Sequence, residues 1–174
     1  MTEAALQELI DSWENLEFLI EEIKSRPEHL PALMKIALSS DHPKSWRAAW
    51  IADKVHGENP ALLSPYFDTF ISYLKTGNHP GKKRHFLKII SLNEVNPKHI
   101  PFLTDYCMKT FTSGETPTGV RVHALQILYN ISEKEPGLKP ELLAVIEHVN
   151  ELHPSPGIRS RSRKLAAKLR QQLM

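Results

Sequence analysis

The sequence predicts an all-α protein built from stacked helical hairpins, and three observations lead to this prediction. Single prolines recur every 37 residues, at Pro43, Pro80, Pro117 and Pro154. Three glycines recur every 38 residues, and the apolar residues between these positions repeat at the spacing of an α-helix. A hairpin of this length cannot bury its apolar side alone, so neighbouring hairpins must stack into an α-solenoid.

The beginning of the chain is expected to form an amphipathic helix that caps the N-terminal end of the stack, over residues 1–25. Its apolar side chains are Leu6, Leu9, Ile10, Trp13, Leu16, Ile20 and Ile23. Their spacing follows one face of a helix, with a break expected near Asp11 and Ser12.

Four helical hairpins are expected to follow, over residues 27–58, 60–94, 97–134 and 136–172. Together with the capping helix they make a single predicted domain, residues 1–174. In each first helix a proline takes the first turn, and an apolar anchor follows two residues later. The prolines are Pro31, Pro65, Pro101 and Pro140, and the anchors are Leu33, Phe67, Leu103 and Leu142.

The second helix of each hairpin carries the centre of the buried stripe. These central residues are Ile51, Ile89, Ile127 and Leu165. Glycines such as Gly77 and Gly114 are expected just after helix ends, because the left-handed backbone conformation found there favours glycine.

The second helices resemble those of HEAT-like and armadillo-type repeats, whose second helix commonly has the pattern V-R-x-x-A-x-x-x-L. GVRVHALQILYNI at 119–131 matches it, GIRSRSRKLAAKL at 157–169 matches in part, and WRAAWIADKV at 46–55 matches loosely. GKKRHFLKIISL departs from it, with bases where the Val-Arg pair would be. The resemblance implies a right-handed α-α superhelix whose second helices line the concave side. It does not imply one activity, because this class of fold serves many functions.

The composition is that of one globular domain, with 174 residues, 41% hydrophobic and 24% charged. Its net charge of +2 hides an uneven distribution, since residues 1–24 sum to −6 and residues 157–174 to +6. One hypothesis is therefore a homo-oligomer in which the acidic N-terminal helix contacts the basic C-terminal helix of another copy.

The cysteine content and the hydropathy predict a cytoplasmic protein that does not enter a membrane. Cys107 is the only cysteine, so no internal disulfide can form, and its place on the inward helix face predicts a core residue. No apolar run approaches the roughly 18 residues that span a bilayer. The opening residues are acidic, unlike a signal peptide.

Candidate binding residues lie beside the buried stripe of the second helices, which the resemblance places on the concave side. They are Trp46, Arg47, Trp50, Lys83, Arg84, His85, Arg121, His123, Arg159 and Arg161. Four of them share one position at the 38-residue offset, and we name this set the cationic ridge: Arg47, His85, His123 and Arg161. Such a ridge can pair with protein carboxylates or with nucleic acid phosphates. Solvated helix faces also carry charges of this kind.

Trp46 and Trp50 are four residues apart and therefore share one helix face. Two interpretations follow: the indoles bind a partner, or they pack against the N-terminal helix with Trp13. DNA glycosylases built as solenoids resemble this chain in architecture and use aromatic and acidic residues on the concave face. Here only a loose grouping with Asp53 and Arg47 is similar, so that activity is not carried over.

The first functional hypothesis is a non-catalytic scaffold that holds a protein or peptide along the inner helices. The alternative is nucleic-acid binding through the same cationic ridge, with base repair as an extension of it. The nine histidines lack the spacing of metal ligands, and no G-x-S-x-G nucleophile motif occurs. No catalytic residue, metal site or cofactor is predicted, and enzymatic activity is left open.

Overall fold

The computed structural model describes all residues, 1–174, and contains ten α-helices and no strand, so the predicted all-α class is confirmed. The chain divides into two compact units, Met1–Ile89 and Ile90–Met174, which are described one at a time. None of the helices combines the length and the apolar character needed to cross a membrane. The single domain over residues 1–174 stays a prediction.

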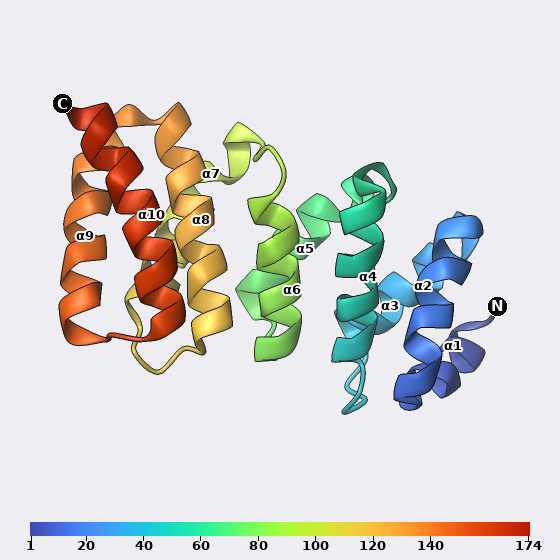
Figure 1. Cartoon of the computed structure of the whole chain (residues 1–174). Coiled ribbons are helices and arrows are strands. Elements are labelled where there is room, and N and C mark those ends of the chain that lie inside the picture. Colours follow the sequence, from blue (N-terminus) through green and yellow to red (C-terminus); the bar gives the residue numbers. More distant parts are fainter. The chain divides into compact units, whose positions relative to one another are not determined.

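The first unit consists of three short helix pairs (Figure 1). Its helices are α1 (Glu3–Asp11), α2 (Leu16–Ser25), α3 (Leu30–Ser39), α4 (Trp46–Glu58), α5 (Phe67–Thr76) and α6 (Pro80–Ser91), the last of which ends just past the boundary. The N-terminal segment breaks at Ser12, where a short 3-10 turn, Trp13–Asn15, separates α1 from α2. Helix α1 packs on α3 and α2 packs on α4, so first and second helices form two layers.

The second unit consists of two longer helix pairs. Its helices are α7 (Ile100–Thr112), α8 (Thr118–Lys134), α9 (Lys139–Leu152) and α10 (Pro156–Leu173). Helix α7 packs on α8 and α9 packs on α10, while α10 also packs on α8. Figure 1 shows α9 and α10 lying side by side at the C-terminal end of the chain.

The predicted stripe of the second helices is buried in both units. Ile51, Ile89 and Ile127 are fully buried and Leu165 is nearly so. Burying one such side chain contributes about 1.5–3 kcal/mol relative to leaving it in water. Shared burial between neighbouring helices is therefore the main source of stability in each unit.

The anchor predicted for the second hairpin is wrong by three residues. Phe67 is only half-buried, and Phe70 is the fully buried side chain, stacked on Phe86 with ring centroids 4.8 Å apart. The cause is a 3-10 turn, Ser64–Tyr66, which takes up Pro65 before α5 begins at Phe67. In the other hairpins Pro31, Pro101 and Pro140 lie in the first turn of their helices.

The left-handed conformation expected for the glycines is also wrong. No glycine has a positive φ, and Gly77 ends α5 with φ −72° and ψ 146°. What Gly77 provides is space, because a Cβ there would lie 2.3 Å from the ring of Tyr73. That ring packs edge-on against Phe86 with centroids 5.1 Å apart. The glycine therefore admits an aromatic side chain to the core.

Replacing Ile127 tests the buried stripe. We expect Ile127→Asp to lower the free energy of unfolding by about 4 kcal/mol and the Tm by roughly 10 °C, because it buries an unpaired charge. Ile127→Val, which keeps the side chain apolar, should cost only about 1 kcal/mol. Thermal denaturation followed by circular dichroism compares the two, and equal melting of both variants would contradict the assigned register.

Candidate functional site

All three tryptophans of the chain meet at the surface of the first unit, and we name Trp13, Trp46 and Trp50 the tryptophan cluster. Trp13 comes from the turn between α1 and α2, and the other two from the beginning of α4. Its ring centroid lies 6.2 Å from that of Trp46 and 5.5 Å from that of Trp50. The packing expected between α4 and the N-terminal segment therefore exists, but 54% of Trp13 remains exposed.

Two cations lie over the rings of the tryptophan cluster. The guanidinium carbon of Arg47 is 5.2 Å from the ring centroid of Trp13 and 6.0 Å from that of Trp46. The ammonium of Lys54 is 5.4 Å from the ring centroid of Trp50. All three distances suit a cation–π attraction, so this surface is aromatic and positively charged.

A buried ionic network ties α6 to α4 beside the cluster. Asp53, only 4% exposed, accepts a hydrogen bond from Nδ1 of His85 at 2.9 Å. The ammonium of Lys88 lies 2.9 Å from Oδ1 and 3.1 Å from Oδ2 of the same carboxylate. Burial raises the pKa of Asp53, but the hydrogen bonds from His85 and Lys88 and the charge of Lys88 outweigh it, so the pKa is lowered. The carboxylate is therefore ionised at neutral pH.

Basic residues at the start of second helices close the C-terminal ends of first helices. Arg47 donates from Nη1 to the carbonyls of Ile10 and Asp11, each at 3.0 Å, at the end of α1. Lys82 donates to the carbonyl of Ser40, at 2.9 Å, just after α3. Such carbonyls lack partners within their own helix and carry the negative end of its dipole.

The second unit has the same kind of helix capping. Arg121 of α8 donates from Nε to the carbonyl of Phe111, in the last turn of α7, at 2.9 Å. Bases in a first turn oppose the dipole of their own helix. Their position at the beginning of α4, α6 and α8 is thus explained by the carbonyls that they reach.

Two of the predicted binding residues are not on the surface, and that expectation is wrong for them. Arg121 is 3% exposed because its guanidinium is hydrogen-bonded to the carbonyl of Phe111. His85 is 7% exposed because its ring is hydrogen-bonded to Asp53. Desolvation lowers the pKa of the Arg121 guanidinium, as it does that of the buried Lys82 ammonium.

The cationic ridge links successive helix pairs. Arg47 bonds back to the end of α1, His85 to Asp53 on α4, and Arg161 of α10 to Oε1 of Gln126 on α8, at 2.7 Å. Three of its four members therefore join a second helix to the pair before it. The fourth, His123, is half-buried on α8.

The remaining predicted residues are more accessible. Arg84 and Arg159 are exposed, while Lys83 is half-buried. Trp46 and Trp50 are half-buried within the tryptophan cluster. Like Arg47, His123 and Arg161, these five predicted side chains are at least partly accessible to a partner, and the exposed Trp13, which was not predicted as a contact, lies beside two of them.

The helices are paired, and Arg47, His85 and Arg161, at equivalent positions of second helices, bond to the pair before them. The family model of the HEAT repeat domain matches residues 2–169. The chain belongs to the HEAT repeat family. The predicted HEAT-like fold is therefore confirmed. HEAT repeats generally serve as protein-interaction scaffolds. No curated protein and no solved structure shows significant similarity to the chain.

The thiol and the possible metal ligands of the protein show the following arrangement. Cys107 is fully buried, as predicted, and burial raises the pKa of its thiol far above its ordinary value, so the sulfur stays protonated. No three His, Cys, Asp or Glu side chains come together as a metal site would require. In the tryptophan cluster the groups that meet at the surface are indoles, the guanidinium of Arg47 and the ammonium of Lys54.

The ionic network was not predicted from the sequence. Asp53 is the only acidic residue in the middle of α4, and Lys88 lies on the next second helix. These are weak signals, because the pairing depends on how far α6 is rotated against α4.

Removing the buried carboxylate tests this network. We expect Asp53→Ala to lower the free energy of unfolding by about 2 kcal/mol at neutral pH, because His85 and Lys88 lose their acceptor. Since the pKa of Asp53 is lowered in the folded state, this stabilisation is complete above about pH 4 and is lost as the pH falls further.

Urea denaturation across this pH range measures the difference between the two proteins. Asp105→Ala is the control, because its carboxylate pairs with Lys109 at an exposed site and should cost less than about 0.5 kcal/mol. A difference for Asp53→Ala that persists unchanged below pH 4 would contradict the assigned ionisation.

Proposed function

We propose that this HEAT repeat protein is an interaction module that binds an acidic peptide segment of a partner protein on the face of α4 and α6. The observation that carries the proposal is the tryptophan cluster, whose outermost member, Trp13, is more than half exposed among cations. An exposed indole gains free energy when a partner covers it, and Trp and Arg dominate the binding energy of protein interfaces.

The sign of the charge on these two helices specifies the partner. Helices α4 and α6 carry six Lys and Arg against two acids. The bases are Arg47, Lys54, Lys82, Lys83, Arg84 and Lys88. Both acids are paired within the protein, Asp53 with His85 and Lys88, and Glu58 with Lys24. Lys82 is buried, and the other five bases give the face a positive sign that attracts carboxylates.

Some candidate residues hold the helices of the first unit together, and others are proposed to contact the partner. Arg47 and His85 hold neighbouring helix pairs together, and Lys82 closes the end of α3. This support keeps the tryptophan cluster rigid, which reduces the entropy lost when a partner binds. Contact falls to Trp13, Trp46, Trp50, Lys54, Lys83 and Arg84. In the second unit, His123, Arg159 and Arg161 remain candidate contacts.

A fluorescence titration tests the proposal, because every tryptophan of the chain belongs to the cluster. Short acidic peptides with one aromatic residue, selected from a displayed random library, should shift the intrinsic tryptophan emission. We expect Trp13→Ala to weaken their binding by about 2 kcal/mol, roughly thirtyfold, through loss of the outermost ring. Lys83→Glu/Arg84→Glu should weaken it about tenfold or more.

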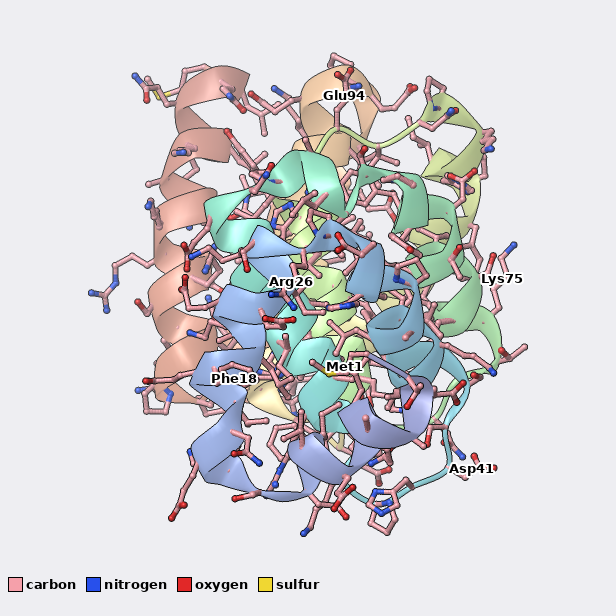
Figure 2. All side chains as sticks on the ribbon, turned by 90° about the vertical axis from the view of Figure 1, so that its right-hand side faces the viewer. Met1, Phe18, Arg26, Asp41, Lys75 and Glu94 are labelled. Atoms are coloured by element: carbon pink, nitrogen blue, oxygen red, sulfur yellow. The ribbon has the colours of Figure 1, made fainter.

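Two control variants match these changes. Phe18 of α2 is 55% exposed, as much as Trp13, but makes no contact with the tryptophan cluster, and Figure 2 shows it on the same N-terminal part of the unit. Phe18→Ala should leave the affinity within about twofold. Arg163→Glu/Lys164→Glu on α10, at two exposed bases outside this face, makes the same change in net charge as Lys83→Glu/Arg84→Glu. Equal binding by Trp13→Ala and Phe18→Ala would refute the assigned contact.

The same surface offers cations and stacking rings to single-stranded nucleic acid. Anisotropy of labelled single- and double-stranded oligonucleotides, measured at low and physiological salt, separates the two classes of partner. Steeply salt-dependent binding that Lys83→Glu/Arg84→Glu abolishes would replace the acidic peptide with nucleic acid.

A further inference from the structure

The first helices of the second unit border an open hollow that belongs to none of the predicted sites. It has a volume of about 570 Å³. Its lining comes from α7, the end of α8, the following turn and the beginning of α9: Ile100, Pro101, Thr104, Asp105, Met108, Ile131, Glu135, Leu138 and Glu141. This volume lies in the range of pockets that take a ligand or an anchoring side chain.

The floor and walls of this hollow are apolar. Ile131 is buried beneath it, and Ile100, Met108 and Leu138 are half-exposed around it. Half-exposed aliphatic side chains gathered in one concavity gain free energy when an apolar group covers them. The hollow therefore suits an apolar side chain of a partner.

The rim of the hollow is acidic. Asp105, Glu135 and Glu141 are exposed, and only Asp105 has an ion-pair partner, Lys109 at 3.0 Å. Glu141 lies in the first turn of α9, where the helix dipole favours a carboxylate. Glu135 caps the C-terminal end of α8, where the dipole opposes it. Glu135 also precedes the 3-10 turn Pro136–Leu138, but its side chain makes no capping hydrogen bond there, so its carboxylate is available to a cationic group.

A second hollow, of about 200 Å³, adjoins the first and shares Ile100 and Ile131 with it. Its lining includes Asn93, Asn130 and the ion pair of Glu94 with Lys134. The two concavities follow one another over the same pair of isoleucines, and the smaller one adds Val95 and the ion pair of Glu94 with Lys134. This arrangement fits an extended segment better than a single compact ligand.

We propose that this groove, formed by α7, the end of α8 and the start of α9, binds a short basic peptide segment of a partner protein. An aliphatic or aromatic side chain of the segment fills the larger hollow, and its flanking Lys or Arg residues pair with Glu135 and Glu141. Charge complementarity selects the partner, since the rim is acidic in a chain whose net charge is +2. This site shares no residue with the tryptophan cluster, attracts the opposite charge and does not rest on the proposed function.

The test uses the whole chain and two sets of fluorescein-labelled synthetic peptides. In one set a central Leu or Phe is flanked by Arg residues, and in the other the same residue is flanked by Glu. Anisotropy titrations should show binding of the basic set that weakens with salt. We expect Glu135→Lys/Glu141→Lys to reduce the affinity about tenfold or more, because two rim attractions become repulsions.

A matched double variant controls for net charge. Glu115 and Glu151 are exposed glutamates outside the groove, and Glu115→Lys/Glu151→Lys makes the same change in charge. Its affinity for the basic set should stay within about twofold of the wild type. Equal losses in the two double variants would overturn the proposal, as would absence of binding by the basic set.

The two proposals are tested independently. Loss of acidic-peptide binding in Trp13→Ala concerns only the tryptophan cluster, so either proposal can fail alone. A second copy of the chain is the other occupant to test, because its α10 carries six Lys and Arg and no acid. Sedimentation of the unliganded protein detects such self-association. Self-association that Glu135→Lys/Glu141→Lys abolishes would assign the groove to that helix and overturn the partner peptide.

Discussion

Each helix pair in this protein can bury its apolar stripe only against a neighbouring pair, and this shared contact is the constraint on which the rest depends. The contact brings the carbonyl ends of first helices next to the beginnings of second helices. Unsatisfied carbonyls there would cost free energy, so cations reach across to them, as Arg47 and Lys82 do between pairs of the first unit. In the second unit Arg121 does the same within one pair, from α8 to the end of α7. The packing that buries the apolar stripes thus also places cations where they satisfy the carbonyls at helix ends.

This capping role changes how the basic residues at helix starts are interpreted. A base near a helix start looks like a binding residue when only the charge pattern is considered, yet His85 and Arg121 are buried and paired. What distinguishes a proposed contact residue is its exposure to solvent, as for Arg84 and for Trp13, of which 54% is exposed. The supporting bases and the contact residues lie within a few positions of each other, so the binding face is built on the rigid part of the fold.

The two candidate surfaces differ in chemistry for a reason within the repeat. Second helices carry the cations that reach the carbonyl ends, and their exposed face is correspondingly basic on α4 and α6. First helices have no such demand, and the groove beside α7 and α9 is rimmed by carboxylates. A scaffold with a cationic aromatic face and an acidic groove can discriminate between partners by charge, which sets specificity and association rate more than affinity.

The sequence by itself determined the fold class, because proline spacing and helical periodicity report on local backbone and on burial. It also placed Cys107 and the stripe through Ile127 in the core. Only the tertiary structure decided the space that Gly77 leaves for Tyr73, the pairing of Asp53 with His85 and Lys88, and the meeting of Asp105, Glu135 and Glu141 around one hollow. These depend on the rotation and spacing of helices distant in the chain, which no local pattern encodes.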